Sequence, residues 1–398
     1  MNPNSLDDWL DFIDLNRPRE DEFGLNRLRP ITDIIFQSTI AEKIVVIGGT
    51  NGKGTTAEVL NNLLQESNFK IGLYTSPHLF KFNERIRING VPVSNSEIID
   101  AFEEVKNLKN DTRLTYFDYA TLAAFIIFAK NNLDVAILEI GLGGRYDPVN
   151  LVDPDISILT NVELDHQKWL GNTREQIGEE KSAIFRDGKI IIMGSNNMPS
   201  SVMKKVEDLN AKTLQLEEDF FIEELTTSNL NKESVACSIA AYKEITNCEI
   251  DFNTVLKNTS LLGRCDVNNK FILDVSHNLA SVKNLVTFLN KDFKGKSIKA
   301  VVGLMKDKDI HDIIREVKGI VSEWYACSPN MERAMSANDL KELIFAETKT
   351  KVDAFETVDL AVKEALKEDD SDLVLIFGSF FTVSEAYKSL SKLKQIEL

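Results

Sequence analysis

Residues 43–56 combine the residue types that bind a phosphate group. Four β-branched aliphatic residues at 44–47 predict a strand buried on both faces. Glycines, a lysine and two hydroxyls follow, and then the apolar spacing of a helix. In such an arrangement backbone N–H groups surround a phosphate, while the lysine and the positive end of the helix add charge complementarity. We therefore predict a phosphate-binding loop, with an ordinary strand-to-helix turn as the alternative.

The loop departs from the strict Walker pattern in two ways. The first glycine of that pattern would fall at Ile47, and Gly54 directly follows the lysine. The metal-binding hydroxyl is therefore expected one residue later, from Thr55. The residues predicted to hold phosphate are Asn51, Gly52, Lys53, Gly54 and Thr55.

Polar residues also close or follow three other predicted strands, at 70–74, 133–139 and 156–162. These residues are Ser76, Glu139 and His166. In open α/β sheets ligands bind at the carboxyl ends of the strands. A carboxylate that closes a buried strand is costly unless a cation accompanies it, so Glu139 indicates a metal ion. Each residue alone is compatible with a structural role, but their shared position predicts a metal–phosphate site.

Strands alternate with helical patterns along the chain, which predicts an α/β fold. The first domain, 1–259, is expected to hold a mostly parallel sheet flanked by helices, in the manner of P-loop ATPases. A smaller Rossmann-like α/β domain, 260–398, is expected to follow, since a strand and its loop are predicted at 271–278 and further strands at 299–305, 323–327 and 373–379. The stretch 196–232 shows no clear pattern.

Composition limits the classes of partner. The chain has 398 residues and a formal net charge of −16, which argues against nucleic acid or an anionic membrane as the main partner. Its four cysteines lack metal-binding spacing, and the start of the chain lacks the charge and apolar pattern of a signal peptide. No apolar run reaches the ~20 residues that span a bilayer. We expect a cytoplasmic monomer.

Nine short motifs run in order along nearly the whole chain. They lie at 49–55, 74–79, 82–86, 138–145, 164–166, 180–184, 262–264, 273–278 and 377–380. Together they resemble the folylpolyglutamate synthase/dihydrofolate synthase family of the Mur ligase superfamily. That resemblance implies a magnesium-dependent ligase that uses ATP to join L-glutamate to dihydropteroate and to tetrahydrofolates. It also implies roles for individual residues, which are given next.

The resemblance assigns ATP to the phosphate loop, and Mg²⁺ to Thr55, Ser76, Glu139, His166 and a carbamylated Lys181. Carbamylation would turn a cation into an anion that supports a metal-bridged phosphate. The remaining nucleotide contacts would come from Ser234, Arg264 and Asp274. Together with Lys53 and Lys181, the residues implied in catalysis are His277 and Ser379, near the incoming glutamate.

Further segments resemble those that hold dihydropteroate in the bifunctional bacterial members. The residues are Glu22, Phe23, Gly24, Leu25, Thr115, Tyr116, Phe117, Arg145 and Asp147. This chain departs from the family pattern at Glu22-Phe23, where Asp-Leu is usual, and after Asp147, where Pro148-Val149 replace Ala-Thr. Ser234 stands where the family has asparagine, with Asn231 nearby, so the adenine contact is left open.

The chemistry of amide formation agrees with these residues. A carboxylate does not react directly with an amine, because oxide would have to leave. Phosphorylation by ATP gives an acyl phosphate, and metal ions together with positioning supply most of the remaining catalysis. No nucleophilic Ser–His or Cys arrangement is needed.

Three alternatives remain at this point. A monofunctional folylpolyglutamate synthase would share all of these motifs. A peptidoglycan-type Mur ligase would carry a substrate domain of roughly 100 residues before the phosphate loop, whereas 47 residues precede Gly48 here. A regulatory ATPase would need only the nucleotide domain.

Overall fold

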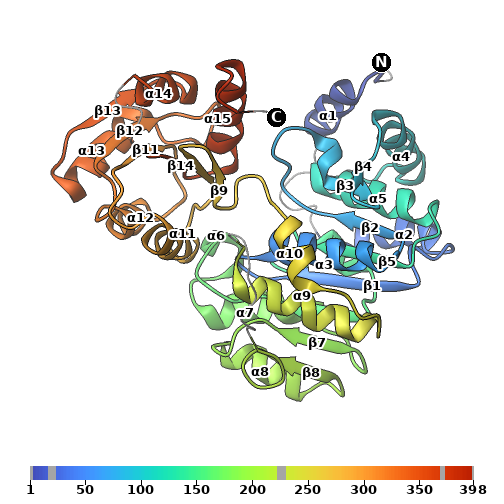
Figure 1. Ribbon diagram of the computed structural model, residues 1–398. Coiled ribbons are helices and arrows are strands. Elements are labelled where there is room, and N and C mark those ends of the chain that lie inside the picture. The colour runs from blue at the N-terminus through green and yellow to red at the C-terminus, as the bar shows by residue number, and fades with distance from the viewer. Residues whose placement is uncertain (1–2, 17–23, 222–229, 368–372, 397–398) are drawn as a thin grey trace. The chain divides into compact units, whose positions relative to one another are not determined.

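The computed structural model describes residues 3–16, 24–221, 230–367 and 373–396. These residues form two compact units, each with its own sheet (Figure 1). The first unit ends at Thr259 and the second begins at Ser260, with Leu230 grouped with the second. The two units are described separately below.

The described part of the first unit contains a sheet in the order β4-β3-β2-β5-β1-β6-β7-β8. Its strands are β1 (Lys43–Gly48), β2 (Ile71–Tyr74), β3 (Ile86–Ile88), β4 (Val91–Pro92), β5 (Val135–Glu139), β6 (Ile156–Leu159), β7 (Ile190–Met193) and β8 (Lys212–Gln215). The six neighbouring strands β2-β5-β1-β6-β7-β8 pair in parallel. At one edge, β3 pairs antiparallel with β2 and with β4. The predicted mostly parallel sheet is confirmed. Because β1 lies between β5 and β6, the loop after β1 emerges between the carboxyl ends of two buried strands.

Helices cover both faces of this sheet. They are α1 (Leu6–Leu15), α2 (Arg29–Ile35), α3 (Lys53–Glu66), α4 (Asn95–Leu108), α5 (Tyr116–Ala129), α6 (Gln167–Leu170), α7 (Arg174–Lys181), α8 (Ser200–Glu207), α9 (Lys232–Ile245) and α10 (Phe252–Asn258), with the short 3₁₀ helices η2 (Leu25–Arg27), η3 (Phe82–Arg85), η4 (Pro148–Leu151) and η5 (Ser182–Ile184). Val46 and Leu138 belong to a core shared with α1, α2, α4 and α5. Val45 and Ile137 are fully buried outside that core, because successive side chains of a strand point to opposite faces. Their face is covered by α3, which packs on β1, β2, β5 and α9 (Figure 1).

The second unit is also α/β, as predicted. Its sheet, as far as the described residues form it, has the order β13-β12-β11-β14-β10-β9, in which β9 pairs antiparallel with β10 and the other pairs are parallel. The strands are β9 (Asp266–Asn268), β10 (Phe271–Asp274), β11 (Ile298–Val302), β12 (Glu323–Cys327), β13 (Val352–Phe355) and β14 (Leu373–Phe377), and the helices are α11 (Leu279–Asp292), α12 (Ile310–Val317), α13 (Ala337–Thr348), α14 (Val358–Ala365) and α15 (Phe380–Lys392).

The structure differs from the sequence prediction mainly at exposed or short elements. The unpatterned stretch 196–232 contains α8 and β8. Only Gln215 of β8 is buried, because β8 is an edge strand, so its sequence lacks the apolar run of a central strand. The helix after the phosphate loop begins at Lys53, one turn before its apolar spacing does. Within the described residues, no helix is long and apolar enough to cross a membrane.

Replacing Gly72 with alanine should lower the free energy of unfolding by about 1–3 kcal/mol, the usual cost of overpacking. A Cβ at this position of β2 would lie 2.5 Å from Leu133 Cδ1 and 2.9 Å from the Phe128 ring, so buried side chains must move. Chemical denaturation measures the change. Gly319→Ala is the matched control, because its Cβ would meet no atom within 4 Å. An equal stability for both variants would contradict this packing.

Candidate active site

The loop after β1 is braced by residues at the end of β6. The hydroxyl of Thr160 donates to the carbonyl of Asn51 at 2.7 Å and to that of Gly48 at 3.3 Å. The side-chain oxygen of Asn161 accepts the N–H of Asn51 at 2.9 Å. Thr50 adds a third link, because its hydroxyl accepts the N–H of Glu163 at 3.0 Å. These contacts fix the backbone of the loop before any ligand is bound.

The residue before α3 is Gly52, whose φ of 86° lies in the left-handed region that favours glycine. Glycine has no side chain that caps the first N–H groups of the helix, so these groups suit an anion. A Cβ on Gly52 would lie 2.5 Å from the hydroxyl oxygen of Ser234. Ser234 is buried and donates to the carbonyl of Gly52 at 3.3 Å. Its hydroxyl therefore supports the phosphate loop, while Asn231 forms the N-cap of α9.

Two lysine side chains converge on the carbonyl oxygen of Gly49. The ammonium nitrogen of Lys181 lies 2.9 Å from that oxygen, and that of Lys53 lies 3.1 Å from it. Lys181 is 5% exposed. Burial, and secondly the charge of Lys53, lower the pKa of Lys181 to about 7. An anion bound at this loop would reduce the repulsion between the two cations.

A carboxylate lies beside the start of α3. Glu139 ends β5, is 4% exposed, and accepts the N–H of Ser76 at 3.0 Å. Both of its carboxylate oxygens lie 3.8 Å from the point where a Cβ of Gly54 would be. The carboxylate thus stands next to the first turn of α3, which also carries the buried Thr55. Oxygen donors of this kind suit Mg²⁺, which prefers to keep waters and phosphate oxygens as its other ligands.

His166 lies beyond the end of β6, at the N-cap of α6, with an exposed side chain and a φ of 51°. The charge of the preceding residue, Asp165, acts on Lys181 and raises its pKa, against the larger effect of burial. The described residues include no group of three His, Cys, Asp or Glu side chains placed to hold a metal ion. The predicted set does not need such a group, because it combines one carboxylate and one imidazole with hydroxyls and a modified lysine.

The glycine-rich loop after β5 is organised by Asp147. One of its carboxylate oxygens accepts the N–H groups of Gly141 and Leu142, each at 2.9 Å, and the other accepts that of Val149 at 2.9 Å. Burial raises the pKa of Asp147 to about 7, although the three N–H groups lower it. Arg145 donates from Nε to Glu180 at 2.8 Å. Asp147 therefore builds the loop, and Arg145 joins the loop to α7.

The described residues of the predicted pterin segments lie at the starts of η2 and α5, and Phe117 of α5 approaches Gly141 of this loop. Thr115 is the N-cap of α5, and the ring of Phe117 lies 6.0 Å from that of Tyr74. The Arg85 guanidinium lies 5.4 Å from the centre of the Tyr116 ring. Gly24 precedes η2, and Leu25 packs against the core. Glu22 and Phe23 lie outside the described residues.

Three of the four residues predicted in the second unit lie at or just beyond the carboxyl ends of β10 and β14. Asp274 ends β10 and accepts the N–H groups of Cys265 at 2.7 Å and Ser276 at 2.8 Å. The imidazole Nδ1 of His277 lies 2.9 Å from the carbonyl of Val275. Ser379 is the buried N-cap of α15 and accepts the N–H of Thr382 at 3.0 Å.

Arg264 of the same unit packs its guanidinium 4.9 Å from the centre of the Phe380 ring. This cation–π contact orients the side chain without neutralising its charge. Phe380 begins α15 directly after Ser379, so Arg264 and Ser379 lie near the same end of that helix.

The sequence prediction missed the residues that brace the site. Thr50, Thr160 and Asn161 hold the phosphate loop, and Arg85 donates to the Nδ1 of His78 at 2.8 Å. Thr160 and Asn161 directly follow the buried β6, so their position as polar residues at a strand end is the one sequence feature that could have identified them. Their partners are backbone atoms far away in the sequence, which no spacing rule identifies.

Comparison with known proteins places the chain in a family. The model described as Mur ligase middle domain matches residues 47–272, and the model described as Mur ligase, glutamate ligase domain matches 263–380. The dihydrofolate synthase/folylpolyglutamate synthase of Buchnera aphidicola subsp. Baizongia pistaciae is 36% identical over 427 residues, which cover 99% of this chain and 97% of that protein. The chain belongs to the dihydrofolate synthase/folylpolyglutamate synthase family of Mur ligases. It is an ATP-dependent ligase.

Two solved structures of this family share the fold. E. coli FolC in complex with DHPP and ADP is 30% identical, with a TM-score of 0.93 and coverage of 99% of each chain. The bifunctional folylpolyglutamate synthase/dihydrofolate synthase with Mn, AMPPNP and L-glutamate bound is 32% identical, with a TM-score of 0.91 and coverage of 98% of this chain and 100% of that chain. The family resemblance and the two-domain α/β fold expected from the sequence are confirmed.

Replacing Asp147 with asparagine should lower the free energy of unfolding by about 1–3 kcal/mol, the cost of a buried unsatisfied polar group. Both carboxylate oxygens accept N–H groups, so the amide nitrogen of asparagine would face a donor. Chemical denaturation measures the loss. The same change at the exposed Asp100 of α4 is the control. Equal stabilities of the two variants would show that the Asp147 contacts are not stabilising.

Proposed function

We propose that this chain adds L-glutamate to dihydropteroate, forming dihydrofolate, and to tetrahydrofolates, forming polyglutamates. The main structural support for this proposal is the phosphate loop held by Thr160 and Asn161, with Lys53, Lys181 and Glu139 around it. Relatives that match almost the full length support the substrates: one structure holds DHPP and ADP, and another holds Mn, AMPPNP and L-glutamate. A monofunctional folylpolyglutamate synthase would use the same loop, so the products decide between the two.

ATP and Mg²⁺ fit the residues present in the first unit. The N–H groups at the start of α3 and the ammonium of Lys53 would hold the phosphates, and Asn51 lies in the same loop. Thr55, Ser76, Glu139 and His166 would supply metal ligands, with Glu139 already beside the helix start. When bound, ATP supplies the phosphoryl group that converts the substrate carboxylate into an acyl phosphate, and Mg²⁺ neutralises charge on the transferred group.

The chain's own residues chiefly position the phosphate groups and neutralise their charge. The bracing by Thr160 and Asn161 holds the loop N–H groups in place before binding, so less reorganisation accompanies phosphoryl transfer. Lys53 brings a positive charge to the point where phosphate charge develops. No residue has to form a covalent bond with the substrate, because the acyl phosphate itself carries a good leaving group.

Lys181 is proposed to act as a carbamate. Two ammonium groups on the Gly49 carbonyl repel each other, and a pKa of about 7 leaves much of Lys181 as the neutral amine at neutral pH. That amine can attack CO₂: an N–C bond forms, one C=O π pair moves to oxygen, and the nitrogen releases a proton. The resulting anion attracts Lys53 and offers oxygens to a hard metal ion.

The other predicted residues are proposed to bind the substrates and the rest of the nucleotide. In the first unit, Gly24, Leu25, Thr115, Tyr116, Phe117 and Arg145 are candidates for the pterin side, together with Glu22 and Phe23. Asp147 and Ser234 support their loops through hydrogen bonds to backbone groups. In the second unit, Arg264 and Asp274 are candidates for the nucleotide, and His277 and Ser379 for glutamate.

Mass spectrometry of the products tests the proposed function directly. With ATP, Mg²⁺ and L-glutamate, dihydropteroate should gain one glutamate and tetrahydrofolate should gain at least one more. Steady release of phosphate from ATP should require both an acceptor and L-glutamate, because the acceptor carboxylate takes up the phosphoryl group and the amine of glutamate then displaces it as phosphate. Addition to tetrahydrofolate alone would establish the monofunctional alternative. ATP turnover without either acceptor would indicate a regulatory ATPase.

Lys181→Ala should be inactive and should regain part of its activity with added acetate. Acetate provides a carboxylate in the space of the missing carbamate, whereas methylammonium provides a cation. Product formation is measured at increasing concentrations of each small molecule, with circular dichroism to verify that the variant is folded. Rescue by methylammonium instead would show that Lys181 works as an unmodified cation.

A further inference from the structure

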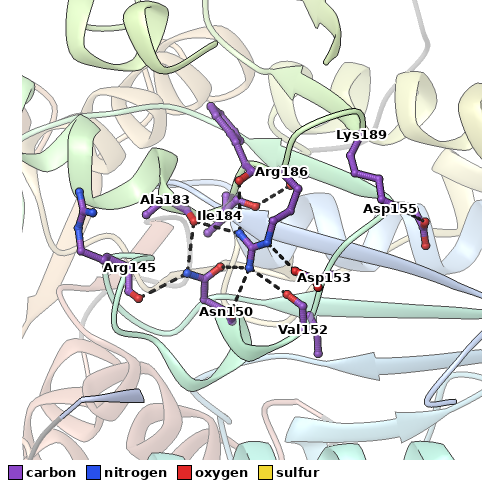
Figure 2. Close-up of polar contacts among 11 residues, drawn as sticks. Arg145, Asn150, Val152, Asp153, Asp155, Ala183, Ile184, Arg186 and Lys189 are labelled. Atoms are coloured by element: carbon purple, nitrogen blue, oxygen red, sulfur yellow. Dashed lines mark hydrogen bonds and ion pairs between the residues drawn. The ribbon is translucent and has the colours of Figure 1, made fainter. Parts of the chain in front are cut away.

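Arg186 ends one of two neighbouring segments that each carry a residue of the proposed site, and its guanidinium joins the two. One segment is the loop from 140 to 153, which follows Glu139 and contains Asp147. The other is 179–186, which contains Lys181, the end of α7 and η5. Figure 2 shows the Arg186 guanidinium with contacts to residues of both segments.

The guanidinium uses all three of its nitrogens. Nη2 donates to the backbone carbonyl and side-chain oxygen of Asn150 and to the carbonyl of Val152, each at 3.0 Å. Nε donates to a carboxylate oxygen of Asp153 at 2.8 Å. Nη1 donates to the carbonyls of Ala183 at 3.1 Å and Phe185 at 3.3 Å. One planar cation thus joins the end of η4 to the end of η5.

Asn150 extends the same connection toward the site. Its amide nitrogen lies 3.4 Å from the carbonyl of Arg145 and 3.3 Å from the carbonyl of Ala183 (Figure 2). Its backbone N–H donates to the carbonyl of Asp147 at 2.8 Å. The amide therefore bridges the two segments at a second point, and its side-chain oxygen is held by Arg186.

The third point of contact lies next to Lys181. The N–H of Arg145 donates to the carbonyl of Glu180 at 3.0 Å. A Cβ on Gly144 would lie 2.7 Å from that carbonyl oxygen and 2.9 Å from the carbonyl oxygen of Lys181, so the two backbones approach closely. A shift of either segment would move Lys181 relative to the loop that Asp147 organises.

We propose that Arg186, acting with Asn150, is a positioning residue that sets the place of Lys181 relative to the loop after Glu139. This inference rests on the proposed function for the role of Lys181 and Glu139. The site itself would not contact Arg186, whose partners are backbone carbonyls, the Asn150 side chain and Asp153. A guanidinium is required because its fixed, planar donors reach several acceptors in different directions, which a single lysine ammonium does not reproduce.

Lys189 provides a matched control on the same stretch of chain. It forms an ion pair with Asp155 at 2.8 Å, and both side chains are more than a third exposed. Figure 2 shows this pair apart from the contacts of Arg186. Lys189→Ala thus removes a nearby cation and one ion pair, but no hydrogen bond between the loop and the Lys181 segment.

Hydrogen–deuterium exchange on the ligand-free protein tests the positioning step without any assay of activity. Arg186→Ala should raise exchange in 141–152 and 180–185 and leave β5 and β7 protected, whereas Lys189→Ala should leave both segments as in the wild type. Should Arg186→Ala fail to fold, Asn150→Ala removes the amide bridge and one acceptor of Arg186, leaves the other contacts of the guanidinium, and is measured in the same way. Unchanged exchange in the folded variant would overturn the proposal.

Kinetics then separate a positioning role from a purely structural one. In Arg186→Ala the magnesium concentration for half-maximal rate should rise by roughly tenfold, the usual effect of losing a partner that orients metal ligands. Arg186→Lys should restore only part of this loss. A magnesium dependence equal to that of Lys189→Ala, at a temperature where both are folded, would overturn the proposal. If the wild type makes no product while exchange responds as expected, the proposed function fails and the structural link stands.

Discussion

Two buried or half-buried lysines share one backbone carbonyl, and the rest of the site depends on this concentration of positive charge. Lys53 reaches the Gly49 oxygen from the start of α3, and Lys181 reaches it from the end of α7. Cations so close together are stable only if an anion, a carboxylate or deprotonation compensates them. Phosphate groups bound at the loop would provide that compensation, as would conversion of Lys181 to a carbamate. The same unfavourable interaction in the ligand-free chain thus favours both ligand binding and modification.

Such a site needs rigid supports, because without them the two ammonium groups would move apart into solvent and relieve their repulsion. The chain supplies these supports from three strands. Thr160 and Asn161 after β6 fix the phosphate loop, Asp147 folds the loop after β5, and Arg186 before β7 joins that loop to the Lys181 segment. Most of these contacts run from side chains to backbone atoms. They therefore hold the path of the chain itself, and through it the side chains that would meet substrate.

The two units contribute different kinds of chemistry. The first unit gathers glycines, lysines, hydroxyls and the buried carboxylate of Glu139 at the carboxyl edge of its parallel sheet, which suits phosphate and metal. The second unit presents Asp274, His277 and Ser379 at the ends of β10 and β14, and Arg264 stacked on Phe380. These groups suit polar and charged parts of ligands, in keeping with the contacts proposed for the nucleotide and for glutamate. A ligase that must activate one substrate and admit a second, charged one has use for both sets.

The sequence by itself determined the strand, glycine-rich turn and helix at 43–66, the alternation of buried strands with helices, and the polar residues Ser76 and Glu139 at strand ends. These features are local: a run of β-branched residues, a glycine-rich turn and a helical spacing lie within a few residues of one another. His166 lies farther on, at the N-cap of α6, because β6 ends at Leu159. Tertiary structure alone decided that β1 lies between β5 and β6, that Ser234 supports Gly52, and that Lys181 and Lys53 meet at one oxygen. It also showed that Arg186 joins two segments, whereas the sequence gives it only as a basic residue after a predicted helix. Its partners are mainly backbone carbonyls, including those of Asn150 and Val152 some 34–36 residues away. Every residue has a carbonyl, so no pattern of side chains marks which ones will meet a guanidinium once the chain has folded.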